Sequence, residues 1–242
     1  AASLLAAILH TSRLTPGARS LLTPLATTVG GQGDVPGLVG VLTDAGRHDV
    51  AVQQACLAGL IDGLSRHSNR VLKSAPSWRP IQQLVSSRSP QVRRLAIRLG
   101  ARLGFSEKPE MRAAFGRAAR ESVNADRSVE KRIEAIRLLA DAPYATMSDT
   151  AISLLAPEHP PSVQLAAIES LKLSSDGRSA AALLHGWRGF TPGLRAAVLD
   201  AIFSRQDRLA PLLDAIEKRL IGRGEVDASR RDQLVNNRDK RV

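Results

Sequence analysis

The chain has 242 residues, of which 43% are apolar and only 3% aromatic, so a sizeable core can form and must be built from Leu, Ala, Ile and Val. It holds 34 basic and 23 acidic residues, a net charge of +11, which favours anionic partners. A single cysteine, Cys56, excludes an internal disulfide framework, an iron–sulfur cluster and a CxxCH haem attachment site.

Apolar residues recur with a helical period along nearly the whole chain, and no stretch alternates apolar and polar residues over the length of a strand. Small polar residues followed by proline predict N-caps with proline in the first helical position, and the glycines at 30–31, 104 and 222 predict helix ends. These N-cap pairs are Thr15-Pro16, Ser89-Pro90 and Thr191-Pro192. We therefore expect an all-α protein. Its helices are expected at approximately 3–10, 16–29, 35–43, 50–66, 80–87, 90–104, 109–122, 128–140, 148–155, 161–173, 178–186, 192–204, 208–222 and 228–235.

The two ends of the chain indicate a segment of a longer protein. It opens on Ala1-Ala2-Ser3 rather than methionine, and its last residues, 238–242, resemble the start of a helix. No apolar run reaches the roughly 20 residues that a membrane-spanning helix needs. The apolar segment Leu4–Leu14 lacks the basic lead of a signal peptide, so the sequence leaves the localisation open.

A helical pattern repeats along the chain: an apolar residue, a small or apolar one three or four positions later, and another at about seven. The second helix of each expected pair begins this pattern, and the starting residues lie 31 to 40 positions apart. A helix–turn–helix unit of this length cannot bury its apolar face alone, so stacked neighbours must supply the core. The starting residues are Val52, Val92, Val129, Val163 and Leu194.

These units resemble HEAT repeats. The best match is 89–99, whose Val92-Arg93 followed by Ala96 is similar to the V-R-x-x-A start of that family's second-helix pattern; 162–171 and 192–202 are weaker copies. The resemblance implies a right-handed α-solenoid. We expect one domain over 1–242, with about five to six helical pairs and a truncated last repeat. An irregular all-α bundle is the alternative.

Three short motifs extend the resemblance to the helical region of large planctomycete-type proteins, which are membrane-bound dehydrogenases or haem-binding proteins. The motifs are Thr28–Asp34, Leu57–Leu64 and Leu234–Asp239. In that family a propeller-like sugar-dehydrogenase domain comes first and a cytochrome c domain with CxxCH comes last. This chain contains neither the CxxCH motif nor a propeller strand pattern. The resemblance therefore implies a connecting helical segment without a cofactor of its own, in a periplasmic or secreted parent.

The positive charge is concentrated in 66–120, which holds thirteen basic and two acidic residues. Three of its arginines are spaced four apart and form one stripe on the helix expected at 90–104, with Arg93 at the edge of the stripe. If second helices line a concave surface, as is usual in such solenoids, the stripe faces a groove. The stripe is Arg94, Arg98 and Arg102, and the next helix adds Arg112, Arg117 and Arg120.

These seven arginines are the candidate surface for an anionic partner, which would be an acidic protein, a nucleic-acid backbone or a lipid headgroup layer. A solvated helix face is the plain alternative, because 28 arginines against six lysines indicate a compositional bias. Base stacking would need exposed aromatic rings beside the arginines. Only Trp78, Phe105 and Phe115 lie near, and Phe115 occupies a core position of its helix.

No local motif points to catalysis or to a metal. None of the histidines (His10, His48, His67, His159 and His185) pairs with another ligand at the spacing of a known metal site. Cys56 is expected to be a small buried side chain rather than a nucleophile. Asp49 and Asp34 are expected to be N-caps, and Asp34 closes a glycine-rich connector that follows a helix rather than a strand.

Some HEAT-like proteins are DNA glycosylases, which use an acidic residue and aromatic rings in a basic groove. Asp62, Trp78 and Trp187 are the parts that this chain offers, although no local motif joins them. Trp187 with Phe190 is instead expected to pack a loop between two helices. The sequence favours a non-catalytic scaffold that links or positions protein domains and binds no small-molecule substrate. The alternative is a nucleic-acid-binding solenoid, including a base-excision enzyme.

Overall fold

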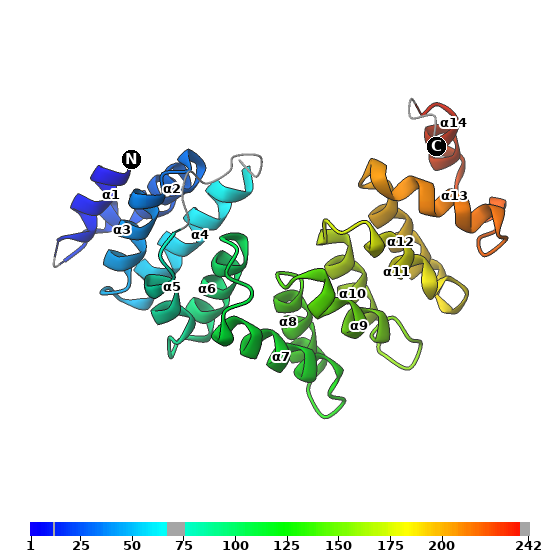
Figure 1. Cartoon of the computed structure of the whole chain (residues 1–242), viewed down its shortest axis with the longest axis horizontal. Coiled ribbons are helices and arrows are strands. Elements are labelled where there is room, and N and C mark those ends of the chain that lie inside the picture. The colour runs from blue at the N-terminus through cyan, green and yellow to red at the C-terminus, as the bar shows by residue number, and fades with distance from the viewer. Residues whose placement is uncertain (12, 67–75, 238–242) are drawn as a thin grey trace. The chain divides into compact units, whose positions relative to one another are not determined.

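The computed structural model describes residues 1–11, 13–66 and 76–237. Within these ranges the protein is all-α, with fourteen α-helices, three single-turn 3-10 helices and no strand (Figure 1). The helices are α1 (Ala2–Leu9), α2 (Pro16–Gln32), α3 (Val35–Ala45), α4 (Val50–Arg66), α5 (Trp78–Val85), α6 (Pro90–Arg102), α7 (Pro109–Val123), α8 (Val129–Leu139), α9 (Tyr144–Ser153), α10 (Pro161–Leu173), α11 (Arg178–His185), α12 (Pro192–Phe203), α13 (Leu209–Glu217) and α14 (Ala228–Val235).

Every helix expected from the sequence has a counterpart in the structure. Three hydroxyls begin α2, α6 and α12 as predicted, and each accepts a hydrogen bond from the backbone N–H three residues later, at 3.2 to 3.4 Å. Asp49 likewise accepts from the N–H of Val52 at 3.0 Å at the start of α4. These hydroxyls belong to Thr15, Ser89 and Thr191.

Two of the predicted helix ends are wrong. Gly30 and Gly31 lie buried inside α2, which ends only at Gln32, before Gly33 takes the left-handed conformation with φ +67°. Gly222 does not end α13, which stops at Glu217; instead it precedes the 3-10 helix η3 (Arg223–Glu225). Helix α9 begins at Tyr144, four residues before the expected start, and Asp34 precedes α3 without a side-chain capping bond.

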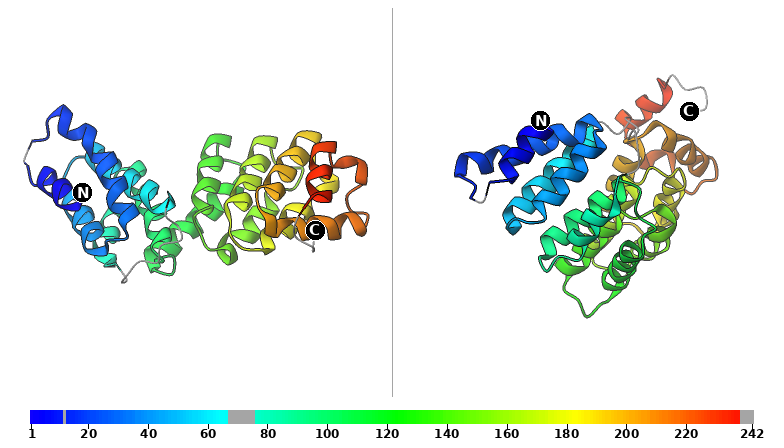
Figure 2. Two further views of the ribbon diagram at one scale, coloured as in Figure 1. Left: turned by 90° about the horizontal axis from the view of Figure 1, so that it is seen from above. Right: turned by 60° about the vertical axis from the view of Figure 1, so that its left-hand side comes forward.

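The chain divides into two compact units, Ala1–Ala114 and Phe115–Val242, and α7 crosses the boundary. In the first unit α1, α3 and α5 pack in succession, as do α2, α4 and α6 (Figure 1). In the second unit α9, α11 and α13 form one such row, and α8, α10 and α12 form the other (Figure 2). Each unit is therefore built of two layers of helices. The single domain expected over 1–242 stays a prediction.

The helices α4, α6, α8, α10 and α12 each have a long hydrogen-bond donor at their fourth residue. This donor reaches back to carbonyl oxygens at the end of the preceding helix or in the connection after it, where the regular hydrogen bonds of the helix end. The donors are Gln53 to His48 at 2.9 Å, Arg93 to Ser87 at 2.9 Å, Arg132 to Ser122 at 2.8 Å, Gln164 to Leu155 and Ala156 at 2.8 and 2.9 Å, and Arg195 to Trp187 at 3.3 Å.

The first pair departs from this pattern. The fourth residue of α2 is Arg19, whose Nη2 donates at 2.7 Å to Asp49, the residue that caps α4 in the next pair. Arg19 and Asp49 are both exposed, so this bond contributes less than the buried bonds of Arg132 and Gln164. We call the set of Gln53, Arg93, Arg132, Gln164 and Arg195 the fourth-position donors.

The replacement Arg132→Met should lower the free energy of unfolding by about 1–3 kcal/mol, because Arg132 is only 4% exposed and the carbonyl of the fully buried Ser122 loses its donor. Arg137→Met, on the exposed face of the same helix, should change it by at most about 0.5 kcal/mol. Urea unfolding followed by circular dichroism measures both variants. Equal midpoints would contradict the structural role of the donor.

Helices α2 and α4 approach each other so closely that only glycine fits at three positions. A Cβ atom on Gly63 would lie 2.1 Å from the carbonyl oxygen of Thr27, and one on Gly59 would lie 2.5 Å from that of Thr23. A Cβ atom on Gly30 would lie 2.5 Å from the Leu60 carbonyl oxygen. This contact explains why Gly30 continues α2 instead of ending it.

We expect Gly63→Ala to destabilise the first unit by about 1–3 kcal/mol, because the backbones must separate to admit the methyl group. The control is Gly40→Ala in the middle of α3, where no atom lies within 4 Å of the added Cβ. That change should stabilise the helix by up to about 1 kcal/mol. Thermal unfolding of the two variants compares them; a Gly63→Ala protein as stable as the parent would show that the helices separate without cost.

Candidate anion-binding surface

Helix α6 buries one face in the first unit and exposes arginines on the other. Its apolar residues Val92, Ala96 and Leu99 are completely buried, and the helix packs on α4 and α5. Arg94 and Arg102 are exposed and Arg98 is half-buried, as the four-residue spacing predicts. The stripe is therefore a surface feature of α6.

Arg93 differs from the other six candidates. Its Nη1 donates to the carbonyl oxygens of Ser87 at 2.9 Å and Arg88 at 3.4 Å, and its side chain is half-buried. It is one of the fourth-position donors, so its main contact is with the loop between α5 and α6. A partner would have to compete with these bonds to engage Arg93.

The arginines of α7 lie opposite its buried residues, which include Met111 and Phe115. Arg112 in the first unit and Arg117 and Arg120 in the second are all exposed. Within the described part of the chain, these three guanidinium groups and that of Arg102 have no carboxylate partner, whereas Glu121 of the same helix pairs with Arg127 at 3.6 Å. One groove containing all the candidates stays a prediction.

The aromatic residues near this surface are partly used for packing. The rings of Trp78 and Phe105 lie 5.1 Å apart between centroids, tilted by 49°, and both residues are half-buried. Phe115 is 1% exposed, which confirms its predicted core position. The Trp78–Phe105 pair is thus a partly exposed aromatic pair of the first unit.

Cys56 is completely buried in α4, as expected for a small apolar side chain. Burial in apolar surroundings disfavours the thiolate and raises the pKa of Cys56 to about 12. The thiol is therefore protonated at neutral pH.

Native protein should react with Ellman's reagent far more slowly than a free thiol, by about a thousandfold or more, because the thiolate is scarce and the sulfur is covered. After unfolding in urea, the same cysteine should react at once and with full stoichiometry. Rapid labelling of the native protein would contradict the buried position of Cys56.

The other candidate chemical groups have local partners. His48 donates from Nε2 to the Leu9 carbonyl oxygen at 2.6 Å, and Nδ1 of His159 lies 3.1 Å from Nη2 of Arg132. Asp62 pairs with Arg66 at 2.8 Å. His67, with the rest of 67–75, and the expected helix start at 238–242 lie outside the described residues.

Trp187 does not have the exposure that stacking on a base requires. It is 1% exposed in the 3-10 helix η1 (Trp187–Gly189), between α11 and α12, and Phe190 beside it is also buried. Its Nε1 donates to Glu225 at 3.2 Å. Both aromatic residues pack the connection between two helices, which confirms the prediction made for them.

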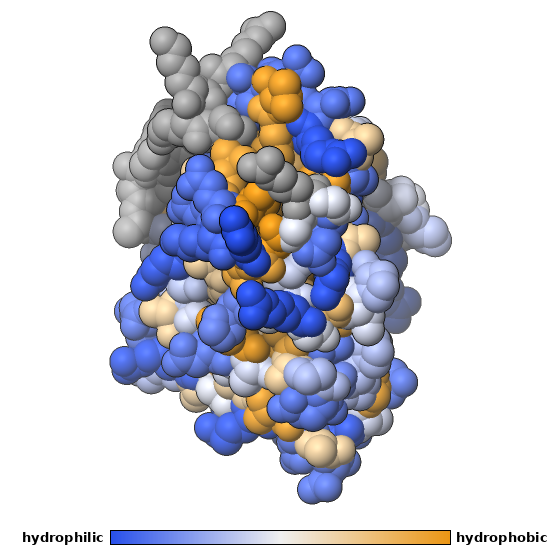
Figure 3. Space-filling model, turned by 90° about the vertical axis from the view of Figure 1, so that its right-hand side faces the viewer, coloured by the Kyte–Doolittle hydropathy of each residue, from blue (hydrophilic) through white to orange (hydrophobic). Residues whose placement is uncertain are grey.

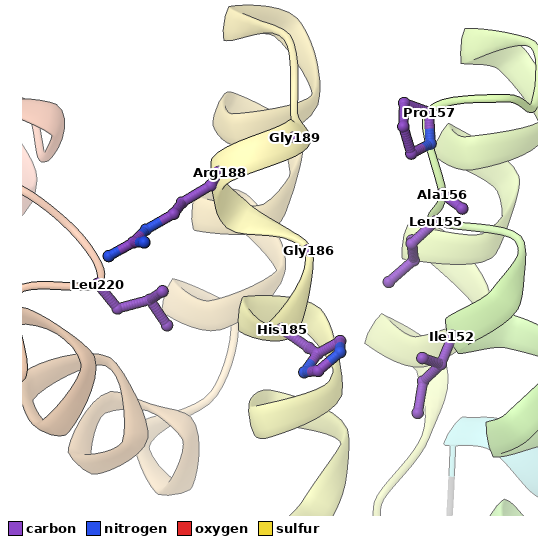
Figure 4. A pocket seen from close by; sticks show the side chains of 9 residues that line it. All are labelled: Ile152, Leu155, Ala156, Pro157, His185, Gly186, Arg188, Gly189 and Leu220. Atoms are coloured by element: carbon purple, nitrogen blue, oxygen red, sulfur yellow. The ribbon is translucent and has the colours of Figure 1, made fainter.

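A groove that no sequence pattern predicted lies in the second unit (Figure 4). It has a volume of about 440 Å³ and runs from the end of α9 across η1 to the segment after α13. Its residues come from three separate segments, so no local motif could have revealed it. They are Ile152, Leu155, Ala156, Pro157, His185, Gly186, Arg188, Gly189 and Leu220.

Hydrophobic side chains also reach the surface of the second unit. Leu173 is 68% exposed and Val235 is 83% exposed, on α10 and α14. On the face seen in Figure 3, hydrophobic residues gather in a band between hydrophilic ones. Exposed apolar surface of this kind is typical of proteins that bind other proteins.

No helix in the described ranges combines the length and the apolar character that a membrane crossing requires. The same residues contain no group of three or more His, Cys, Asp or Glu side chains that could hold a metal ion. Comparison with protein-family models, with curated proteins and with solved structures finds no match for the chain. The resemblance to HEAT-repeat proteins therefore stays a prediction.

Proposed function

We propose that the protein is a non-catalytic interaction scaffold: an α-solenoid of HEAT-like helical pairs that binds acidic protein partners through surface arginines. These are the arginines of α6 with Arg112 in the first unit, and Arg117 and Arg120 in the second. The observation that carries this proposal is the repeated pair, in which a first-layer helix, a second-layer helix and a fourth-position donor recur in both units. Stacked pairs of this kind form extended surfaces suited to binding other proteins.

The charge distribution supports an acidic partner. The segment 66–120 contributes a large positive excess, and Arg102, Arg112, Arg117 and Arg120 have no carboxylate partner among the described residues. Unpaired surface arginines attract acidic groups over a distance and can bind carboxylates through two parallel hydrogen bonds. In a right-handed solenoid the α6 stripe would face the concave side.

The resemblance to planctomycete-type multidomain proteins adds a linking role to the proposal. In that arrangement the helical pairs would hold a dehydrogenase domain and a cytochrome c domain at a defined separation. Within each unit, successive pairs pack directly on one another, which supports a spacer role for these helices. Coding sequence for both domains in the same reading frame would support the linking role, and a reading frame with neither would remove it.

Nucleic-acid binding is the second candidate. It is favoured by the same unpaired arginines together with the half-buried Trp78–Phe105 pair, which could receive a base if it opened. Base excision has less support, because Trp187 is buried and Asp62 is paired with Arg66.

The double replacements Arg102→Glu with Arg112→Glu, and Arg117→Glu with Arg120→Glu, test the arginine surface. Each should weaken binding of a fluorescent poly-glutamate peptide by about tenfold or more, measured by anisotropy. The control is Arg137→Glu with Arg231→Glu, two exposed arginines outside the surface, which should have a much smaller effect.

Single-stranded and duplex DNA are titrated in parallel at several salt concentrations. The scaffold proposal expects no DNA binding at physiological salt. DNA binding that falls steeply with salt and is lost in the same variants would favour the nucleic-acid alternative. Poly-glutamate binding that is equal in the surface and control variants would contradict an acidic partner on α6 and α7.

A further inference from the structure

The groove in the second unit has an apolar wall and a basic rim. Ile152, Leu155 and Pro157 form the wall at the end of α9, and Figure 4 shows the His185 side chain turned toward it. On the other side of η1, the Arg188 side chain extends toward Leu220. None of the nine lining residues, all within the described part of the chain, is acidic.

The backbone between the two sides of the groove is held firmly. Trp187 is buried beneath η1, and Arg195 donates to the carbonyl oxygens of Trp187 at 3.3 Å and Arg188 at 3.4 Å. Arg195 also forms an ion pair with Glu225. These bonds hold the backbone of η1 in place. The exposed side chains of Arg188 in η1 and of His185 before it therefore have a defined position.

The glycines of this segment leave space over η1. A Cβ on Gly186 would lie 2.6 Å from the ring of Phe190, so glycine there allows the ring to pack under the turn. A Cβ on Gly189 would meet no atom within 4 Å. Gly189 therefore faces open space, and an occupant can lie directly on the backbone.

Arg188 is available to such an occupant. Its guanidinium is exposed and has no carboxylate partner among the described residues, while its own carbonyl oxygen is bound by Arg195. A carboxylate placed over η1 would find this guanidinium at one end of the groove and apolar side chains at the other. Arg binds carboxylates with well-defined geometry, so it can select an acidic group.

We infer that this groove docks an extended peptide segment of a partner protein, with an apolar side chain against Ile152, Leu155 and Pro157 and an Asp or Glu side chain on Arg188. The inference rests on the proposed scaffold function and names a second, more selective site for its partner. The complementary charge of the rim and the apolar wall together define the ligand. Small-molecule sites usually enclose most of their ligand, whereas Pro157, Arg188 and Gly189 are all exposed along this groove.

The test uses two leucine replacements that differ only in position. Gly189→Leu fills the groove, and Gly193→Leu, at the start of α12, is its control, because a Cβ at either site meets no atom within 4 Å. Random linear peptides displayed on phage are selected on the whole protein and then screened on the two variants. Circular dichroism checks that both variants are folded.

We expect a class of peptides that bind the parent protein and the Gly193→Leu variant and lose at least about tenfold in affinity on Gly189→Leu. These peptides should share an apolar residue next to Asp or Glu. Arg188→Glu should weaken them by about tenfold or more, and the charge-matched Arg137→Glu should leave them unchanged. The inference is overturned if no peptide distinguishes the two leucine variants, or if those that do are basic or uncharged.

A fatty carboxylate, dodecanoate, is the second probe. Two measurements use it: a titration of dodecanoate into the protein, and a competition with the bound peptides. If micromolar dodecanoate shifts the amide resonances of His185 and Gly189 and also displaces the peptides, the groove is a small-carboxylate site and the peptide inference fails. A different outcome is a set of peptides that bind the Gly189→Leu variant normally and lose their affinity for the variant with Arg117→Glu and Arg120→Glu. If all selected acidic peptides behave in this way, the scaffold proposal is supported and the groove is not a peptide site. If acidic peptides bind neither to the groove nor to the arginines of α6 and α7, both the groove inference and the proposed scaffold function are contradicted.

Discussion

The pairing of helices depends on one recurring bond, which runs from the fourth residue of α4, α6, α8, α10 and α12 back to the end of the preceding helix or the connection after it. A helix ends with carbonyl groups that lack partners, and a two-helix unit brings them under the next helix, away from water. Arg132, Gln164 and Arg195 donate to carbonyls of these helix ends and connections in the second unit, and Gln53 and Arg93 do so in the first. The side chain thus sets where the second helix starts relative to the first.

This use of arginine changes how the basic composition is interpreted. Arg208 is 1% exposed and donates to carbonyl oxygens at the ends of α10 and α12, among them those of Ser174 at 2.7 Å and Ala201 at 2.8 Å. A guanidinium can donate several hydrogen bonds in a fixed plane, which a lysine cannot do. Part of the excess of arginine over lysine therefore stabilises the fold. Fewer arginines are available to a partner than the composition alone suggests.

The helices could be predicted because their signals are local. The hydroxyls of Thr15, Ser89 and Thr191 and the apolar period place the helices within a few residues of where the structure has them. The end of α2 could not be predicted, because Gly30 serves a contact with Leu60 that is distant in sequence.

The exposure of the candidate arginines could be predicted only in part, because it also depends on contacts between segments. The exposed stripe on α6 follows from its four-residue spacing, but Arg93 was assigned to the surface although its position four residues after the cap Ser89 marks it as a donor to the loop. Repetition of that interval in α4, α8, α10 and α12 was a signal that the sequence contained. The groove beside Arg188 had no such signal, because its walls come from three segments.

The fourth-position bonds lie within a pair, whereas the glycine contacts of α2 and α4 lie between pairs. A pair that carries its own bond can be duplicated or deleted as a unit during evolution, because this bond does not depend on the neighbouring pairs. The first two pairs are not independent in this way. Gly30 of α2, and Gly59 and Gly63 of α4, allow the two helix backbones to approach each other closely, and a larger residue on either helix would prevent it. They form a module that any recombinant array would have to inherit whole.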